Sequence, residues 1–413
     1  MVTRNAAQNT KRSLALIFLI MLMDIIGLSI LAPVAPYIVQ KYNGSALMVT
    51  LLFAIYAAAQ FAAAPALGKI SDRVGRRPVL LVCVLGSAVG YFIFGVGGAL
   101  WVLFFSRLID GITGGNLSTA AAYIADISKP EDRAKNFSLI GMAYGFGFIL
   151  GPALGGALGQ ISLTAPLFAA GIVSLISVVL IYFLLPESLQ QEHRTTEPMT
   201  PGDFNPFVSV GQMLVRPGLG LVLVVSMLFN MAFDGINSTT PIFIVHKFAA
   251  QPWQIGVLFV AVGIAMAVVQ GALSRPMTER FGEKGMATFS LVGNAIGGVL
   301  FLAAPALWMV YPIIFVQMAV TGFVFSSMGS LATSYVSARE QGQMAGVNAS
   351  LAGLASMLGP VWAGAAYDAI GPGSQFLISA AILVVACLLL AHARKPERAV
   401  EQVNGLAVNE VSA

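Results

Sequence analysis

Four ionisable residues stand inside long apolar stretches of this sequence: Asp24, Arg107, Asp110 and Asp234. A charge at the centre of a bilayer costs at least ~2.5–3.5 kcal/mol on insertion scales. Each of these residues therefore needs a partner of opposite charge, access to water or, for a carboxylate, a bound proton. A carboxyl group in such a place can take up and release protons.

Asp24 has the most central position of the four. Twelve residues separate it from Arg12, about 18 Å along a helix at 1.5 Å per residue, which is close to the midplane of a bilayer. Because burial disfavours the charged form of a carboxyl group, we expect Asp24 to carry a proton during function. The alternative is a permanently protonated hydrogen-bond donor.

The other three charges allow a functional and a structural interpretation. Arg107 and Asp110 are spaced i, i+3 and can pair on one helix, either only to enter the membrane together or to tune a neighbouring carboxyl group. Asp234 lies one helical turn beyond Asn230 on the same face, and a solvated or structural role is its alternative. Three asparagines are candidates for lining a substrate cavity: Asn116, Asn230 and Asn237.

These residues must be positioned by membrane-spanning helices. Of 413 residues, 57% are hydrophobic and 10% are charged, whereas soluble domains carry about 25% charged residues. A spanning helix needs ~20 apolar residues, which predicts an all-α membrane protein with twelve transmembrane helices. The expected spans are 14–38, 46–67, 79–97, 100–123, 137–158, 164–185, 218–245, 253–273, 286–304, 307–331, 344–366 and 374–393. The first apolar run is too long for a cleavable signal peptide.

The distribution of basic residues predicts the orientation. With the N-terminus inside, nineteen of the 22 Lys and Arg residues fall on the cytoplasmic side, and only Lys41 and Lys247 fall outside. We therefore expect both termini to be cytoplasmic. The net charge of +4 is explained by loops that face anionic headgroups, so no nucleic-acid partner is expected.

Cysteines and histidines indicate no cofactor. Cys83 and Cys387 lie in apolar spans and read as core residues. The histidines at 193, 246 and 392 lack the spacing of metal ligands. Without a metal site or a nucleophile–base pair, we expect no enzyme, no metal and no cofactor.

The chain contains an internal repeat. IVQKY at 38–42 matches IVHKF at 244–248, Asp72-Arg73-x-Gly75 matches Glu279-Arg280-x-Gly282, and Gly151-Pro152 matches Gly359-Pro360, at offsets of 206 to 208 residues. A polar, proline-containing linker separates the copies. The expected domains are a six-helix bundle at 1–186, a linker at 187–216, a second six-helix bundle at 217–393 and a cytoplasmic tail at 394–413.

The charged stretch GKISDRVGRRP, Gly68 to Pro78, is too short and too charged to cross a bilayer and predicts a tight turn between two spans. It resembles the loop 2–3 signature of the major facilitator superfamily. LFFSRLIDGITGG, Leu103–Gly115, resembles the R-x-x-x-G signature of the same family, which is implicated there in proton transfer; Arg107 and Gly111 match it. Asp110 departs from the pattern, so no role is carried over to it.

The fifth span carries a glycine pattern. Residues 147, 151, 155 and 159 are glycines, which gives one smooth face for close helix packing, and a proline inside a helix bends it. G-x-x-x-G-P-x-x-G-G resembles the antiporter signature of drug:proton exporters and favours efflux over uptake. The matching residues are Gly147, Gly151, Pro152, Gly155 and Gly156.

Met23–Ile38 and Ala121–Gly141 narrow the resemblance to the tetracycline-efflux-like branch. It implies a cytoplasmic gate in which Asp72 faces the start of helix eleven at 342–345 and Arg76 pairs with Asp126, both only in the outward-open state. The expected gate residues are Gly68, Asp72, Arg73, Gly75, Arg76, Asp126 and Arg133. Several of the basic residues in the charged stretch at 68–78 also help to keep the loop on the cytoplasmic side of the membrane.

The expected function is proton-coupled efflux of small amphipathic compounds, such as drugs or toxins, across a bacterial inner membrane. Tetracycline exporters carry further carboxylates in helices three and nine, and the corresponding spans here have none, so an apolar, neutral or weakly basic substrate fits as well. The partners would be a small-molecule substrate, protons and the lipid bilayer, and we expect a monomer. An exporter of an endogenous metabolite such as a siderophore is the first alternative, and a non-transporting membrane sensor is the second.

Overall fold

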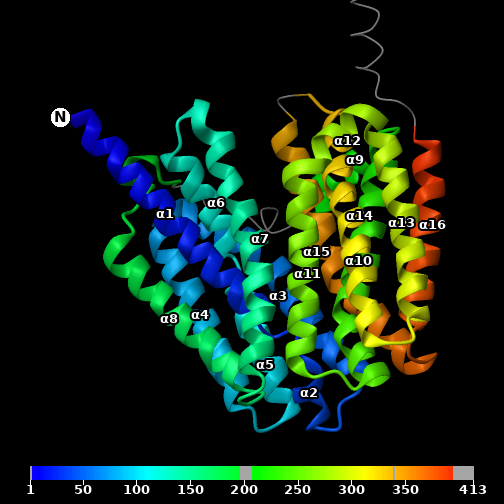
Figure 1. Ribbon diagram of the computed structural model, residues 1–413. Coiled ribbons are helices and arrows are strands. Elements are labelled where there is room, and N and C mark those ends of the chain that lie inside the picture. The colour runs from blue at the N-terminus through cyan, green and yellow to red at the C-terminus, as the bar shows by residue number, and fades with distance from the viewer. Residues whose placement is uncertain (1, 196–206, 338–339, 394–413) are drawn as a thin grey trace, which may run out of the picture. The chain divides into compact units, whose positions relative to one another are not determined.

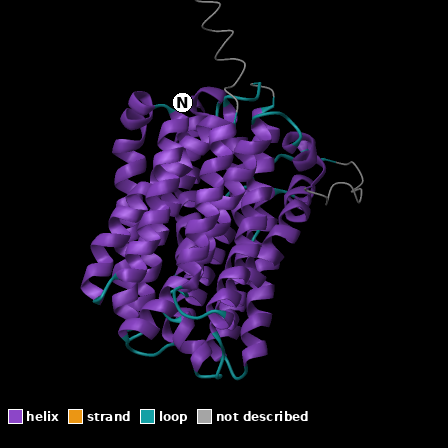
Figure 2. Ribbon diagram, turned by 90° about the vertical axis from the view of Figure 1, so that its right-hand side faces the viewer, coloured by secondary structure: helices purple, strands orange, loops and turns teal. Residues whose placement is uncertain are grey.

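The computed structural model describes residues 2–195, 207–337 and 340–393. Every regular element in these ranges is a helix (Figures 1 and 2), which confirms the predicted fold class. Eleven helices among the described residues are long and apolar enough to span a membrane. The remaining predicted span, the fourth along the chain, consists of two shorter helices, α5 (Leu100–Ile112) and α6 (Asn116–Ile127).

The remaining helices of the first half have these bounds: α1 (Val2–Ser29), α2 (Ala35–Gln40), α3 (Ala46–Val74), α4 (Arg76–Val96), η1 (Pro130–Asp132), α7 (Arg133–Leu158), α8 (Ala165–Leu184) and η2 (Gln191–His193). The helices of the second half have these bounds: α9 (Phe207–Leu214), α10 (Leu219–Phe248), α11 (Pro252–Val268), the π-helical turn η4 (Val269–Leu273), α12 (Ser274–Phe281), α13 (Glu283–Ala303), α14 (Leu307–Thr333), α15 (Gln341–Ala369) and α16 (Ser374–His392).

Two spans that were expected to be continuous are broken. The first ends at Ser29 and resumes at Ala35 as α2, whose second residue is Pro36; proline fits the first turn of a helix because no hydrogen-bonded N–H is needed there. The fourth span breaks at 113–115, where two glycines follow Thr113. The hydroxyl of Thr113 donates to the Ile109 carbonyl at 2.9 Å, and such side-chain bonds compete with the helix.

The turn predicted at Gly68–Pro78 is also shorter than expected. Helix α3 continues to Val74 and α4 begins at Arg76, so the connection is the single residue Gly75. Its φ of 109° and ψ of 160° are open only to glycine at low cost. The charged residues of this stretch therefore lie on helix ends.

The repeat is visible in the backbone. Gly282, which corresponds to Gly75, connects α12 to α13 with φ 74° and ψ 159°. The repeat-related prolines Pro152 and Pro360 both lie inside helices, α7 and α15. Equivalent sequence positions thus adopt equivalent local structures in the two halves.

Packing groups the chain into two compact units. Unit 1 comprises Met1–Phe204, Asn237–Ile264 and Pro360–Pro372, and unit 2 comprises Asn205–Ile236, Ala265–Gly359 and Gly373–Ala413. One end of the second-half helices α10, α11 and α15 therefore packs with the first bundle. The sequence-based domain boundaries stay a prediction, and the tail at 394–413 and part of the linker lie outside the described residues.

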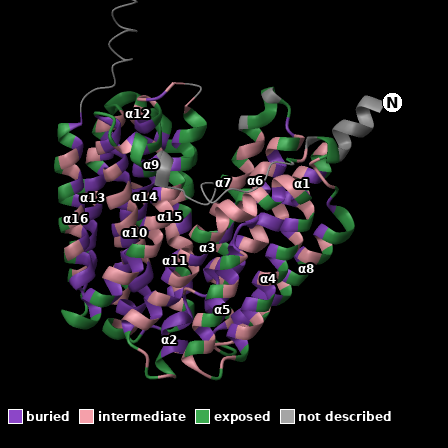
Figure 3. Ribbon diagram, turned by 180° about the vertical axis from the view of Figure 1, so that it is seen from behind, coloured by how far each residue is buried: buried purple, intermediate pink, exposed green. Residues whose placement is uncertain are grey.

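Each unit has its own apolar core. In unit 1 the core includes Ile20, Leu80 and Tyr123, and in unit 2 it includes Phe229 and Leu291. Figure 3 shows exposed residues along the helices as well as at their ends. Large apolar side chains are among them, namely Trp101, Phe183, Trp308 and Leu388. Such exposure fits contact with lipid rather than with water.

Candidate functional site

The Asp24 carboxylate has a defined partner. Asn116, the first residue of α6, donates a hydrogen bond from Nδ2 to Asp24 Oδ1. Its own Oδ1 accepts from the Leu117 backbone N–H at 3.0 Å. Asn116 is buried and Asp24 is half-buried. The break in the fourth span therefore starts a new helix at the point where its first side chain meets the carboxylate of α1.

Helix α3 stabilises this break. Gln60 donates from Nε2 to the Gly114 carbonyl at 2.8 Å and contacts the Tyr56 hydroxyl at 3.2 Å. The Gly114 carbonyl would otherwise lack part of its hydrogen bonding, because the helix is interrupted there. Gln60 thus fixes the geometry that delivers Asn116 to Asp24.

Arg107 and Asp110 form the ion pair that their spacing allows, with 2.9 Å between Arg107 Nη1 and Asp110 Oδ2. Both side chains are 2% exposed. The Arg107 guanidinium lies 5.2 Å from the ring of Tyr91 and 5.1 Å from that of Phe94, both on α4, and cation–π contacts of this kind add to the pairing.

The Arg107 guanidinium is nevertheless incompletely satisfied. Its Nε and Nη2 have no hydrogen-bond acceptor among the described residues. A buried donor without an acceptor costs about 1–3 kcal/mol.

The glycine stripe of α7 makes the close helix packing that the sequence predicts, and its neighbour is α1 with the residue that follows it, Ile30. A side chain at Gly147, Gly151 or Gly155 would collide with Ile25, Ser29 or Ile30. The Ser29 hydroxyl also donates to the Gly147 carbonyl at 3.1 Å. Close approach of the two backbones therefore depends on the stripe.

The last glycine of the pattern faces another helix. A Cβ on Gly156 would lie 2.8 Å from the Pro252 carbonyl oxygen and 3.1 Å from Gly256 Cα, both on α11. The Pro152 carbonyl oxygen would in turn lie 2.7 Å from a Cβ on Gly256. The helix-five signature thus seats α7 between α1 and one end of α11, all within unit 1.

Asp234 lies in unit 2 with a partner of its own. Ser356 on α15 donates from Oγ to Asp234 Oδ2 at 2.6 Å. Asn230 donates from Nδ2 to the Ser226 carbonyl of its own helix at 2.7 Å. Asn237 is half-buried and belongs to unit 1. The structure therefore pairs Asp234 with a serine that the sequence did not single out.

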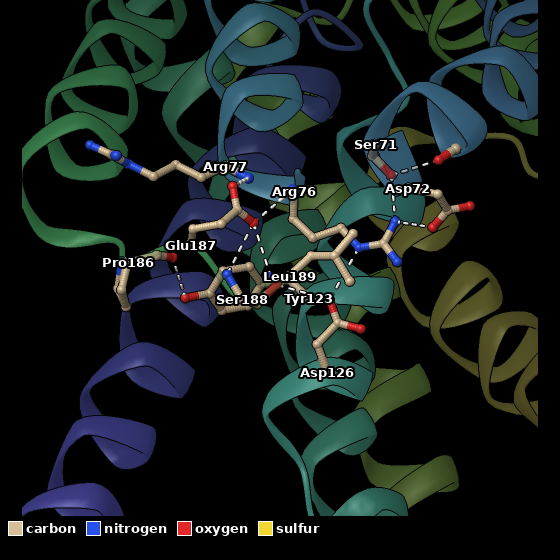
Figure 4. Close-up of polar contacts among 11 residues, drawn as sticks. Ser71, Asp72, Arg76, Arg77, Tyr123, Asp126, Pro186, Glu187, Ser188 and Leu189 are labelled. Carbon is tan, nitrogen blue, oxygen red and sulfur yellow. Dashed lines mark hydrogen bonds and ion pairs between the residues drawn. The ribbon is translucent and has the colours of Figure 1, made fainter. Parts of the chain in front are cut away.

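A network of charged side chains covers the end of unit 1 that carries Gly75. Arg76 is its centre (Figure 4): Nη1 lies 2.5 Å from Asp72 Oδ1 and 2.6 Å from Ser71 Oγ, and Nε lies 3.1 Å from Asp126 Oδ2. The Arg76 side chain is 9% exposed. The expected Arg76–Asp126 pair is present and joins only helices of the first bundle.

Glu187 completes this network and was not predicted. It follows Pro186 at the end of α8, and its carboxylate accepts from the backbone N–H groups of Arg76 at 2.8 Å and Arg77 at 3.2 Å. A carboxylate at a helix N-terminus satisfies unpaired N–H groups and matches the helix dipole. The sequence signal was available, because α4 has no acidic residue in its first turn.

Gly68 joins this network through its carbonyl, which accepts from Ser71 Oγ at 2.7 Å. Of the other expected gate residues, Arg73 is half-buried and Arg133 is exposed at the start of α7. Ser188, which was not expected, donates from Oγ to Asp126 Oδ2 at 2.9 Å.

Comparison with known proteins decides the family. The family model of the Major Facilitator Superfamily matches residues 17–277 and 236–408. The chain belongs to the major facilitator superfamily. Its fold is accordingly that of twelve transmembrane helices in two six-helix bundles.

Individual relatives agree. The class C tetracycline resistance protein of Escherichia coli is 34% identical over 377 residues, covering 89% of this chain and 93% of the relative. The class G protein of Vibrio anguillarum is 33% identical, covering 91% and 96%. These relatives confirm the resemblance to the tetracycline-efflux-like branch. The crystal structure of the human organic anion transporter MFSD10 matches with a TM-score of 0.70 and 25% identity, covering 92% and 99%.

This major facilitator protein is thus a multi-pass membrane transporter of small molecules, and its relatives are transporters rather than enzymes. The structure places some of the predicted site residues in groups other than those that the sequence suggested. Asn116, which was predicted to line the substrate cavity, donates a hydrogen bond to Asp24. The roles of these residues in transport are proposals.

Proposed function

We propose that this major facilitator protein exports small amphipathic compounds in exchange for protons, with both chain termini in the cytoplasm. The observation that carries the proposal is the hydrogen bond from Asn116 to Asp24, which lies towards the C-terminal end of α1. It places a carboxyl group beside a break in a neighbouring helix, where a change of protonation alters a specific contact.

In the proposed cycle Asp24 takes up a proton when the protein is open to the outside. The proton leaves to the cytoplasm when substrate binds from that side, which makes substrate and proton mutually exclusive. Asn116 can donate its N–H to the carboxylate and cannot donate it equally well to a protonated oxygen that carries its own hydrogen. The state of Asp24 is therefore linked to the position of α6.

Arg107 and Asp110 support this cycle as a second charged group in the same bundle. Their pairing at 2.9 Å leaves part of the guanidinium without an acceptor. We assign Arg107 the role of an electrostatic partner that responds to the charge of Asp24. Asp234, held by Ser356, is the corresponding candidate on α10.

Efflux as the direction is supported by the helix-five pattern and by the relatives, which are named as tetracycline resistance proteins. Alternating access would move Asp72 between Arg76, its partner at 2.5 Å, and the start of α15. Because the spans 79–97 and 286–304 contain no carboxylate, the proposed substrates are neutral or weakly basic. An endogenous metabolite remains the alternative substrate on the same scaffold.

The test uses purified full-length protein and a panel of compounds that includes tetracycline, neutral drugs and weakly basic drugs. Binding of a substrate should release protons from the wild type, and Asp24→Asn should bind without release. Asp234→Asn removes a carboxylate from the other repeat, and its proton release shows whether Asp234 also takes part in coupling. If Asp24→Asn still exchanges substrate for protons in proteoliposomes, Asp24 is not the coupling site.

A further inference from the structure

The N-terminus of α3 is capped by a carboxylate from a different helix. Asp368, in the last turn of α15, accepts hydrogen bonds from the backbone N–H groups of Ala46 at 3.1 Å and Leu47 at 3.0 Å. Each N–H meets a different oxygen of the carboxylate. Ser45, the residue that usually caps such a helix, makes no side-chain cap here. Asp368 therefore satisfies the first two N–H groups of α3.

The two helices approach closely next to this cap. A Cβ on Gly364, one turn before Asp368, would lie 2.9 Å from Leu47 Cα, and it would also collide with Thr50. Thr50 is fully buried. This end of α15 thus packs backbone to backbone on the first turns of α3, within unit 1.

Neighbouring contacts close the same end of unit 1. His246 Nδ1 at the end of α10 lies 2.7 Å from the hydroxyl of Tyr367, the residue before Asp368. The Tyr37 hydroxyl of α2 donates to the Ala250 carbonyl. The Tyr37 bond and the Asp368 cap thus join the two sequence halves at this end, and the His246–Tyr367 contact joins α10 to α15.

Helices α3 and α15 carry matching aspartates at their C-terminal ends. Helices α3 and α15 each contain 29 residues, and each carries an aspartate in its last turn, Asp72 and Asp368. In the proposed function Asp72 meets the start of α15 on the cytoplasmic side. In the structure Asp72 is paired with Arg76 while Asp368 caps α3.

We propose that Asp368 is the gating residue of the non-cytoplasmic side. Its carboxylate holds the start of α3 while that side is closed and releases it when that side opens. This inference rests on the proposed alternating access. Asp368 is exposed, so water replaces its bonds when the helices part. The free energy needed to break these hydrogen bonds is therefore small, as a contact that opens in each transport cycle requires.

The test follows the opening of that side without measuring transport. Thr50→Cys, in full-length protein from which Cys83 and Cys387 are removed, is alkylated only when α3 and α15 separate. Adding Asp368→Ala should raise the alkylation rate about 5-fold, the population change expected for the loss of one helix cap. Ser45→Ala, which alters the neighbouring residue without removing the cap, is the matched control and should leave the rate within about 2-fold of the parent.

Asp368→Asn keeps one acceptor oxygen and should raise the rate about 2-fold, which keeps the test usable if the alanine variant is not monodisperse. An unchanged rate in both variants, or an equal rise with Ser45→Ala, overturns the gate. Proton release from the same protein tests the proposed function separately. A faster alkylation without proton coupling would support the gate and reject antiport.

Discussion

The connection between α3 and α4 and the connection between α12 and α13 are repeat-related and share two devices. In both, a single glycine with positive φ begins the next helix. In both, the second residue of that helix is basic and reaches the last carbonyls of another helix. Arg77 bonds to Ile181 and Tyr182 at the end of α8, and Lys284 bonds to Ala391 and Ala393 at the end of α16.

The first residue after the glycine differs in charge. Arg76 bridges Asp72 and Asp126 in the first copy, whereas Glu283 occupies the equivalent position in the second and accepts from Ser330. Asp126 is replaced by Thr333 at the same offset of 207 residues. Among the described residues around the second connection, the ion pair is that of Arg275 and Glu279, and it is exposed. The repeat thus preserved the backbone and the helix-end contacts and built a charge network in one copy only.

Removing Arg76 should have the largest effect. Arg76→Ala removes the cation that pairs with both Asp72 and Asp126, and leaves Asp126 with the Ser188 hydroxyl alone among the described residues. It should destabilise the protein by about 3 kcal/mol, with at least a tenfold loss of transport. Glu283→Ala at the equivalent position is the control and should change stability by less than about 1 kcal/mol. Unfolding midpoints and transport assays in vesicles measure both. Equal losses in the two variants would remove the asymmetry inferred for the two copies.

Alanine at the two hinge glycines should give an intermediate effect. Gly75→Ala and Gly282→Ala both strain a conformation that costs about 1–3 kcal/mol for other residues. Only Gly75 lies against the Glu187 carboxylate, so its variant should also lose the cap of α4, about 1 kcal/mol more. Unfolding midpoints measured in the background of Glu187→Gln should remove that extra loss. Persistence of the difference would mean that Glu187 is not its cause.

Glu340 in unit 2 should give the smallest and most pH-limited effect. Hydrogen bonds from the hydroxyl and backbone N–H of Ser337, together with Arg216, lower the pKa of Glu340 from 4.5 to about 2. A lowered pKa in the folded state contributes stability that is complete above about pH 4.5 and is lost as the pH falls towards 2. The difference in unfolding midpoint between wild type and Glu340→Gln should therefore be constant from pH 5 to 8 and shrink below pH 4.5.

The sequence was sufficient for the class, the repeat and the ion pairs between near neighbours. Hydropathy and basic residues report the membrane directly, and an i, i+3 spacing such as that of Arg107 and Asp110 is enough to predict a pair. Asn116 and Ser356 were not predicted as partners of Asp24 and Asp234, because each is brought there by the packing of a distant helix. Glu187 was missed for the same reason, although the uncapped start of α4 indicated that an acid was needed.

The broken fourth span has a consequence for how the protein enters the membrane. Helix α5 has 13 residues and α6 has 12, so each is shorter than the ~20 residues that cross a bilayer alone. Helix α5 also carries both members of the Arg107–Asp110 pair. We expect this segment to enter the bilayer only after the preceding helices, which supply its contacts. Gln60 of α3 bonds to the break, and the aromatic rings of α4 contact Arg107. Biogenesis of the chain is then ordered, with the second and third spans as prerequisites for the fourth.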